Sequence, residues 1–536
     1  MESSVDWSCD ANEAIHISLV QPGSDGKLKT LSSFQPQFTY PIFGQEETIF
    51  GYKGLNVRLR FAAHNLKSNI NIAYDEKFKP IEDTEALDLN KTLKPWLPEE
   101  SFAPLPEFEQ SVVKDETAKD FKPPGKLVHS YSRNQRNYEI WAASLVDPEA
   151  RLLLNRIQIF VPFFIEGGTP IETDDFDWTL ERWTIYFVYE NLEQPSPSAS
   201  PYAFVGYSNT YRWYYFSNVS GKEPEASDKK QRPTPSDAPF PYPNQISICQ
   251  LPARLRISQF LILQPHQLAG HGSQLYRTIQ TACLADPTIS ELTVEDPNEA
   301  FDALRDTNDY HLLYPEFTKR SITINPDPYP KNASRRQARL VPTSKLIPTE
   351  VLREMRTTFK IAPTQFAHLV EMYLLSQVPE SHRGSRQNSA RLLVQKWRAP
   401  NEHDRRYYWW RILLKQRLYK RHRDLLIQLD RDERLEKLDE TVQNVEEGYE
   451  TLLKSFDVRG KPKAEKEEEE EEAKPEPEPQ AGESKAEEGE EKPRERTKRK
   501  FTIADDDEDE DEGPAANGKT GAAAGADEAA AKRLKT

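Results

Sequence analysis

Residues 254–296 read RLRISQFLILQPHQLAGHGSQLYRTIQTACLADPTISELTVED, and this stretch decides the fold. Leu255 to Leu263 is a short apolar run, which predicts a strand because a buried helix would need more residues. Apolar side chains then recur at helical spacing, at Leu275, Ile279 and Cys283. Pro287 marks the end of this helix, and Leu292 to Val294 predicts the next strand. The stretch therefore predicts a strand, a glycine turn, a helix and a second strand.

The turn between this strand and this helix carries two glycines, Gly270 and Gly272. Glycine lets the backbone approach a ligand, and the N–H groups at a helix start favour an anion such as phosphate. A Walker loop would need Gly-Lys-Ser/Thr, but Gly272 is followed by Ser273 and Gln274. A dinucleotide fingerprint would need a third glycine where Leu275 stands. These residues alone leave open a phosphate site of another kind or only a tight turn.

A resemblance to a known family adds to this pattern. The spacing Gln267-x-x-Gly270-x-Gly272 is similar to the Q/R-x-x-G-x-G/A pyrophosphate loop of the GNAT acetyltransferases. The longer strings resemble the catalytic subunits of type B histone acetyltransferases: RISQFLIL, GHGSQLY, LTVEDPNEAFDALRD, FGQEETIFGYKGL, and FFIE followed by DDFDWTLERW. The resemblance covers about the first 320 residues.

The resemblance implies an α+β protein with the GNAT fold, a mixed and mostly antiparallel central sheet flanked by helices. It also implies acetyl-CoA as the co-substrate. Main-chain groups of three strand residues would bind the pantetheine arm: Phe260, Leu261 and Ile262. The turn would bind the pyrophosphate through seven residues: Gln267, Leu268, Ala269, Gly270, His271, Gly272 and Ser273.

The catalytic residues implied by the resemblance are carboxylates. Lysine has a reference pKa of about 10.4, so its amine must lose a proton before it can accept an acetyl group. Glu295, at a strand end, matches the proposed general base, and Glu166 and Asp296 match supporting acidic residues that would raise its pKa. The alternative is that Glu295-Asp296-Pro297 is only a capped turn before the next helix. The thioester is already activated, so we expect no covalent intermediate.

Two segments match family segments that contact the histone tail. The first is Gln45, Glu46 and Glu47, and the second is Tyr211, Arg212 and Trp213. An acidic loop suits a lysine-rich peptide, and aromatic walls suit a lysine stem. From composition alone, the first is a polar hairpin and the second is part of a core strand. The acidic residues Glu172, Asp174, Asp175 and Asp177 form either a solvated face or an acidic rim for a cationic substrate.

Length and composition predict several domains, because 536 residues exceed one core. We expect a histone-binding α/β domain over 1–140, the GNAT domain over 141–325, a linker over 326–345, a helical domain over 346–456 and a disordered tail over 457–536. Residues 217–245, rich in Pro and Ser, predict a disordered insertion. Residues 461–536 hold 25 acidic and 15 basic residues, a net −10 of the total −16.

The helical domain is expected to contain helices on either side of Pro363, and a long helix or helix pair over residues 404–455. The first half of this last segment is basic and aromatic, with Trp409, Trp410 and Arg411 among its residues. Such a surface could bind nucleic acid. We favour a packed helix whose cations meet the acidic second half, so direct DNA binding is not expected.

Other classes are excluded by what the chain lacks. No stretch has the apolar length of a membrane span, and the N-terminus lacks the order of a signal peptide. Cys9, Cys249 and Cys283 have no disulfide or metal spacing, and the latter two are expected to be core thiols. His266 and His271 flank the turn without a further ligand at metal spacing, so no metal is expected.

The hypothesis is a histone lysine acetyltransferase acting on the N-terminal tail of newly made histones, chiefly the fourth core histone. The family implies a WD40-propeller partner, a link to chromatin assembly, and a location in the nucleus and cytoplasm. Two alternatives remain. One is a GNAT enzyme with a different amine substrate, and the other is a non-catalytic histone escort that uses its acidic tail.

Overall fold

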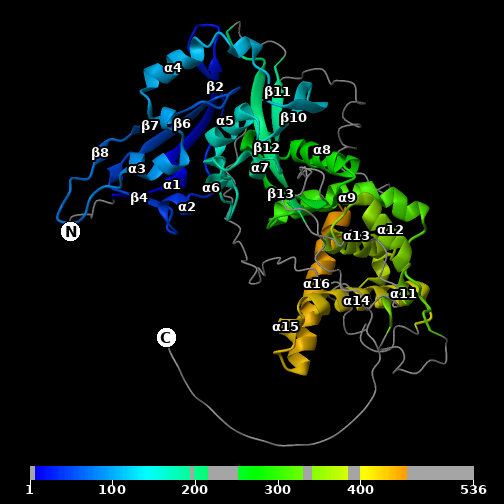
Figure 1. Cartoon of the computed structure of the whole chain (residues 1–536). Helices are drawn as coiled ribbons and strands as arrows, with labels where there is room; N and C mark the ends of the chain where they lie inside the picture. Colours follow the sequence, from blue (N-terminus) through cyan, green and yellow to red (C-terminus); the bar gives the residue numbers. More distant parts are fainter. Residues whose placement is uncertain (1–6, 193–197, 215–251, 330–340, 384–398, 455–536) are drawn as a thin grey trace, which may run out of the picture. The chain divides into compact units, whose positions relative to one another are not determined.

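The computed structural model describes residues 7–192, 198–214, 252–329, 341–383 and 399–454 (Figure 1). The expected insertion over 217–245 and the expected tail over 457–536 lie outside the described residues.

The central sheet has six strands in the order β14-β13-β12-β11-β10-β9. They are β9 (Lys126–Arg133), β10 (Arg136–Ser144), β11 (Trp183–Asn191), β12 (Tyr202–Tyr214), β13 (Ala253–Ile262) and β14 (Ile289–Val294). Neighbouring strands are antiparallel except β13 and β14, which are parallel. The mixed, mostly antiparallel sheet flanked by helices is therefore confirmed, and it is consistent with a GNAT-like fold.

The stretch that decides the fold forms the predicted unit. Helix α8 (His271–Ala285) joins β13 to β14 and buries Leu275, Ile279 and Cys283 against the sheet, as their spacing predicts. The parallel pairing requires such a crossover connection, because two parallel strands cannot be joined by a tight turn. This unit places residues 267–273 and Glu295 at the same end of the sheet, where the strands finish.

The N-terminal part forms a second sheet in the order β3-β2-β6-β7. Its strands are β2 (Ile15–Pro22), β3 (Leu28–Phe34), β6 (Asn56–Ala62) and β7 (Ser68–Ala73). The shorter strands are β1 (Ser8–Asp10), β4 (Thr48–Phe50), β5 (Tyr52–Lys53) and β8 (Glu76–Lys77). The helices are α1 (Ala11–Ala14), α2 (Tyr40–Phe43), α3 (Leu89–Leu93) and α4 (Leu105–Val113), with 3-10 turns η1 (Lys94–Trp96), η2 (Glu99–Phe102) and η3 (Ala118–Asp120).

One hydrophobic cluster joins the two sheets. It contains Ile17 and Phe61 from the N-terminal sheet and Phe187 and Tyr207 from the central sheet. Between β10 and β11 the chain forms α5 (Pro148–Ile157), α6 (Phe160–Phe164) and α7 (Asp177–Leu180). Helices α5 and α6 both contribute buried apolar residues to this cluster. The domain boundary at residue 140 stays a prediction.

The helical part has its own core. Its helices are α9 (Glu299–Lys319), α11 (Thr343–Leu346), α12 (Thr349–Phe359), α13 (Pro363–Ser376), α14 (Glu402–Arg421), α15 (Arg423–Leu426) and α16 (Arg431–Lys454), with the 3-10 turn η6 (Glu380–His382) after α13. A further 3-10 turn, η5 (Gln264–His266), lies between β13 and α8 of the central sheet. Tyr310, Leu313 and Phe317 of α9 are buried in this helical core, so α9 belongs to it. Val341 and Leu346 are also buried there, so the end of the expected linker packs against the helices.

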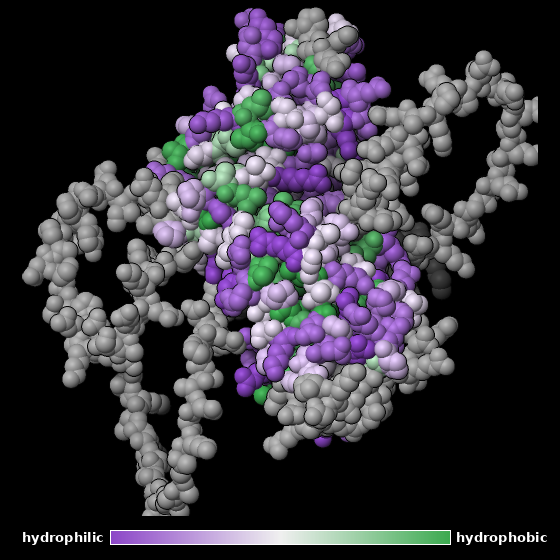
Figure 2. Space-filling model, turned by 90° about the vertical axis from the view of Figure 1, so that its right-hand side faces the viewer, coloured by the Kyte–Doolittle hydropathy of each residue, from purple (hydrophilic) through white to green (hydrophobic). Residues whose placement is uncertain are grey.

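The expected helix pair is formed by α14 and α16, joined by the short α15, and its cations meet acidic partners. Arg411 of α14 lies 3.2 Å from Asp439 and 3.2 Å from Glu446 of α16, and Lys415 lies 2.5 Å from Asp439. This confirms the packed-helix interpretation. An apolar groove between α12, α13 and α14 remains, lined by Leu352, Phe366, Val370, Leu374 and Leu413. Figure 2 shows the face on the right-hand side of Figure 1, where patches of hydrophobic residues lie among hydrophilic ones.

Candidate active site

Strand β13 has an open edge at its second half. It pairs with β12 as far as Ile262, but its pairing with β14 ends where Ile257 meets Val294. The N–H of Leu263 donates to the Val205 carbonyl on the β12 side, so the main-chain groups of Phe260 and Ile262 point the opposite way. The Gln267 amide donates to one of these groups, the Ile262 carbonyl, at 2.8 Å. An extended ligand could therefore hydrogen-bond to β13 as an added strand would.

The turn that follows ends in the N-terminus of α8. Gly270 precedes the helix with φ +83°, a left-handed conformation that favours glycine. The N–H groups of His271, Gly272 and Ser273 begin the helix and have no acceptor within it. Leu268, with φ +60°, is fully exposed. The turn therefore has the donors and the dipole that an anionic phosphate needs.

Gly272 has a role that the sequence did not predict. A Cβ atom at this position would lie 2.7 Å from Cδ1 of Leu304 on α9 and 3.7 Å from the Phe260 ring. Its lack of a side chain lets α8 pack closely against α9. The space beside Gly272 is filled by protein, so this glycine serves the packing of the two helices, and its part in binding a phosphate stays a prediction. A Cβ atom built at Gly270 would have the Arg133 guanidinium as its nearest neighbour, at 3.2 Å.

A cavity of about 620 Å³ lies on the sheet face beside the open edge. Several parts of the chain line it: residues 169–172 with Asp175, then Thr179, Leu180, Arg182 and Trp183, then residues 211–214, and finally Ser258 and Glu295. The Tyr211 hydroxyl lies 3.5 Å from Oε1 of Glu295, and the rings of Tyr211 and Trp183 are 4.6 Å apart. Burial, and then the charge of Glu295, raise the pKa of Tyr211. The cavity combines an exposed carboxylate with aromatic walls.

Four predicted residues come together in this cavity: Glu295, Tyr211, Arg212 and Trp213. The Arg212 guanidinium is ion-paired with Asp286 and donates to the Thr288 hydroxyl at 2.8 Å, so it ties β12 to the turn before β14. Trp213 is 46% exposed, and the Arg256 guanidinium lies 4.4 Å from its ring centre. Trp213 is therefore the predicted aromatic residue most available to a substrate.

Other predicted residues lie outside the lining of this cavity. Asp296 is exposed on the turn after β14, with φ +37°. Glu166 follows α6 and is exposed, and the N–H of its neighbour Gly167 donates to the Tyr40 hydroxyl at 3.1 Å. The clustering of Glu166 and Asp296 around Glu295 is therefore not seen among the residues that line the cavity.

Tyr40 connects the segment Gln45 to Glu47 with the residues after α6, because its N–H donates to Glu47 and its hydroxyl accepts from Gly167. Oε1 of Glu47 accepts the Thr39 N–H at 2.6 Å and the Tyr40 N–H at 3.1 Å, so this side chain caps α2. Gln45 and Glu46 are exposed. Of the three residues, Glu47 thus has a structural use, and the other two remain available to a partner.

Sequence reasoning did not find the residue that holds one wall of the cavity. Gln259 of β13 is 2% exposed, and its amide donates to the Thr169 carbonyl at 2.8 Å. Its Oε1 accepts from the Asn209 amide at 2.8 Å and from the Tyr207 hydroxyl at 3.2 Å. A polar residue inside an apolar strand was the one available signal, because buried polar groups are hydrogen-bonded.

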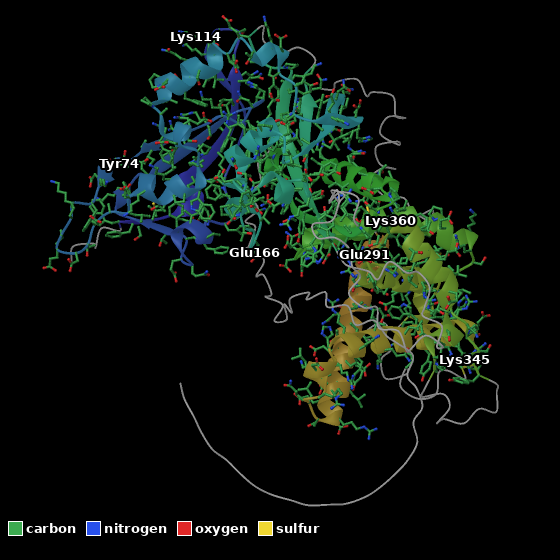
Figure 3. All side chains as sticks on the ribbon, in the orientation of Figure 1. Tyr74, Lys114, Glu166, Glu291, Lys345 and Lys360 are labelled. Atoms are coloured by element: carbon green, nitrogen blue, oxygen red, sulfur yellow. The ribbon has the colours of Figure 1, made fainter. Side chains whose placement is uncertain are left out.

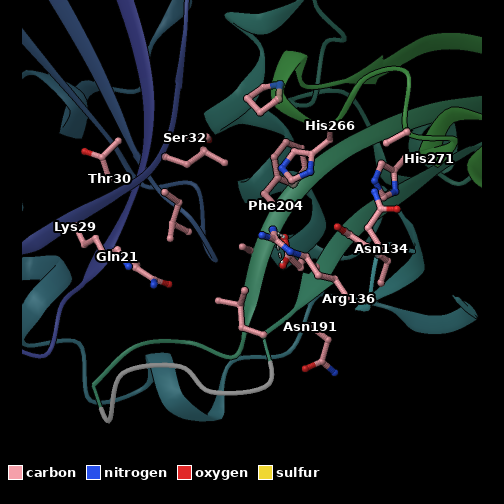
Figure 4. A pocket seen from close by; sticks show the side chains of 18 of the residues that line it. Gln21, Lys29, Thr30, Ser32, Asn134, Arg136, Asn191, Phe204, His266 and His271 are labelled. Atoms are coloured by element: carbon pink, nitrogen blue, oxygen red, sulfur yellow. Dashed lines mark hydrogen bonds and ion pairs between the residues drawn. The ribbon is translucent and has the colours of Figure 1, made fainter. Parts of the chain in front are cut away.

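A second cavity of about 770 Å³ lies on the other side of the turn (Figure 4). Lys29, Arg136 and Glu190 line it together with His266 and His271. The Tyr131 hydroxyl and Nδ1 of His271 are 2.8 Å apart, which fixes this imidazole at the start of α8. Among the described residues, no group of three or more His, Cys, Asp or Glu side chains is arranged to hold a metal. No described helix is long and apolar enough to cross a membrane.

His271 should make stability depend on pH. Burial, and then the nearby His266 and Arg133, lower the pKa of His271 to about 4. An unfolded histidine titrates near 6.5, so stability is fully present above pH 6.5 and falls as the pH drops toward 4, because only the unfolded chain binds the proton there. Titration of His271 should lower the free energy of unfolding by about 2 kcal/mol between pH 7 and pH 5, and we expect His271→Gln to lack this part of the loss. Urea unfolding of both proteins at pH 7 and pH 5 measures this, and equal losses in both would contradict it.

Comparisons with known proteins agree with this architecture. Residues 7–166 match the family described as "Histone acetyl transferase HAT1 N-terminus". The chain is 60% identical over 460 residues to the histone acetyltransferase type B catalytic subunit of Aspergillus oryzae, covering 86% of this chain and 88% of that protein. Identity to the proteins of the same name is 40% in Neurospora crassa (86% and 90% covered) and 33% in Yarrowia lipolytica (85% and 94% covered).

Proposed function

Since this chain belongs to the family of type B histone acetyltransferase catalytic subunits, and is thus an acetyltransferase, we propose that it acetylates lysines in the N-terminal tail of newly made histones, chiefly the fourth core histone. Glu295 serves as the general base, and acetyl-CoA is the donor. One observation carries this proposal: Glu295 stands at the end of β14, beside the open edge of β13, in a cavity with Tyr211 and Trp213. A carboxylate there can reach an amine that lies against the aromatic walls.

The residues present fit coenzyme A. The main-chain groups of Phe260 and the Ile262 N–H, which point away from β12, suit the amides of a pantetheine arm, and the N–H groups that start α8 suit a pyrophosphate. When bound, acetyl-CoA supplies an activated thioester, so the substrate amine can take the acetyl group directly. Cys283 is buried, and burial raises the pKa of its thiol to about 12, which argues against an acylated cysteine.

The protein's own part in the reaction is to position the amine and remove its proton. A lysine stem would pack against Trp183, Tyr211 and Trp213, whose rings form one continuous wall. Glu295, within hydrogen-bond reach or through one water, accepts the proton from the lysine Nζ. The Tyr211 hydroxyl, 3.5 Å from Oε1, helps to orient this carboxylate. The histone tail thus enters across the rim that carries Glu172 and Asp175.

The remaining parts of the proposal follow from the family resemblance. A WD40-propeller subunit would hold the histone beside this chain, and the enzyme would work in both cytoplasm and nucleus, in a pathway linked to chromatin assembly. A mass-spectrometric map of sites acetylated on a mixture of core histones tests the substrate. The proposal expects tail lysines of the fourth core histone to dominate, and an even distribution over all four histones would contradict it.

The acidic rim should contribute to substrate affinity. Hydrogen bonds from the Thr179 hydroxyl and the Phe176 N–H lower the pKa of Asp175, so it is charged at neutral pH. We expect Glu172→Lys with Asp175→Lys to raise KM for a histone-tail peptide about tenfold at low salt, and less at high salt. KM for acetyl-CoA should stay unchanged. Glu433→Lys, an exposed change in α16, is the control. An equal rise of KM in the control would show a non-specific charge effect instead.

A further inference from the structure

The helical domain makes direct contact with the strand that carries Glu295. β14 is an edge strand of the central sheet, and β13 is its neighbour on one side. On its other side, the Leu292 N–H donates to the Lys360 carbonyl at 2.8 Å, and Leu292 forms a parallel bridge with Ile361. The connection between α12 and α13 therefore occupies the outer edge of β14, which would otherwise present unpaired main-chain groups.

The Lys360 side chain holds the same region through a second set of bonds. Its Nζ donates to the carbonyls of Cys283 at 2.9 Å, Leu284 at 3.2 Å and Asp286 at 2.6 Å. These carbonyls lie at the C-terminal end of α8 and just beyond it, where a positive charge is favoured by the helix dipole. Lys360 itself ends α12 with φ +51°, a left-handed position where glycine or asparagine is more usual.

A pair of arginines reinforces this contact. Glu291 of β14 is 8% exposed and accepts from Arg254 of β13 at 2.7 Å and from Arg356 of α12 at 3.3 Å. Figure 3 labels Glu291 and Lys360, which lie close together where the helical domain meets the sheet. In the chain, β14 precedes Glu295 and α9 follows it, and the second half of α9 is buried in the core of the helical domain. Glu295 is therefore held between two segments that the helical domain fixes.

We propose that the helical domain is a support for the active site, and that Lys360 is the positioning residue through which it fixes β14 and the Glu295 carboxylate. This inference rests on the proposed role of Glu295 as the base. Lys360 acts through the strand and does not touch the substrate. A shift of the base by about 1 Å is enough to cost a large factor in rate, because proton transfer depends on near-contact geometry.

The test is the steady-state kinetics of full-length Lys360→Met, with kcat divided by the number of coenzyme A sites that calorimetry counts. This normalisation removes any unfolded protein from the comparison. We expect kcat to fall about 30-fold, while KM for the peptide and Kd for acetyl-CoA change less than twofold. Lys360→Arg, which keeps donors for the same carbonyls, should restore kcat to within about threefold. Lys345→Met, an exposed lysine of α11 labelled in Figure 3, is the matched control.

Two results would overturn the proposal. An unchanged normalised kcat in Lys360→Met would show that the bonds from the Lys360 side chain to residues 283–286 are not needed for catalysis. A loss confined to acetyl-CoA affinity would show that Lys360 supports α8 and its N-terminal turn, not Glu295. Glu295→Gln separates these failures from that of the proposed function: if it is inactive while Lys360→Met is normal, the base assignment holds and only the positioning role fails.

Discussion

Glu295→Gln is expected to lower kcat for histone-peptide acetylation by at least about 100-fold at pH 7, the range typical of a lost general base. The substitution keeps the size of the side chain and the Tyr211 hydroxyl nearby, but it removes the proton acceptor. Acetyl-CoA affinity should stay within about twofold, because Glu295 is not among the turn or edge residues that would hold it. Stopped assays at saturating acetyl-CoA, with calorimetry for affinity, measure both quantities.

The pH dependence sharpens this expectation. The free-amine fraction of a lysine with a pKa near 10.4 rises about tenfold per pH unit, so the Glu295→Gln variant should recover steadily toward pH 9.5. Asp296→Asn is the matched control, since Asp296 lies next in the chain but outside the cavity lining. If Asp296→Asn costs as much as Glu295→Gln, the assignment of the base to Glu295 is contradicted.

Gly270→Val should weaken acetyl-CoA binding by about 10- to 100-fold. A β-branched residue is strained at φ +83°, so we expect the turn to shift and carry the α8 N–H donors with it, whereas the Arg133 guanidinium, 3.2 Å from the new Cβ, can move aside. Calorimetry with the full chain measures the dissociation constant. At saturating acetyl-CoA, kcat should fall only a few-fold, because the cavity around Glu295 is unchanged.

The control for this substitution is Gly448→Ala. Gly448 lies in α16, and a Cβ there would meet no atom within 4 Å. Its acetyl-CoA affinity should equal that of the unmodified protein. If Gly270→Val also binds acetyl-CoA normally, the turn over residues 267–273 is not the phosphate site.

Local patterns predicted what depends on neighbouring residues. The strand, turn, helix and strand over 254–296 follow from apolar periodicity and from Pro287, and the structure forms them with boundaries shifted by a few residues. The helix pair after residue 402 could be predicted from its apolar stripe and from the basic first half and acidic second half of the segment. Each of these features depends on residues that lie close together in the chain, so it could be predicted from the sequence alone.

Contacts between distant segments could not be predicted in this way. Nothing in the sequence indicated that Gly272 also serves helix packing, because the side chain that needs its space comes from Leu304 on another helix. Glu47 appeared to be a free acidic group, but it caps α2. Lys360 gave no signal, because its carbonyl acceptors belong to a helix in another part of the chain. Such roles arise only when the fold brings the segments together.

A crystal structure of the full chain with coenzyme A and a lysine-containing histone-tail peptide would test the central claim most directly. The lysine Nζ should lie about 3 Å from the Glu295 carboxylate, or one water away, against Tyr211 and Trp213. The pyrophosphate should accept from the N–H groups of His271 to Ser273. An amine bound in the second cavity beside His266, or a carboxylate other than Glu295 nearest to the Nζ, would contradict it.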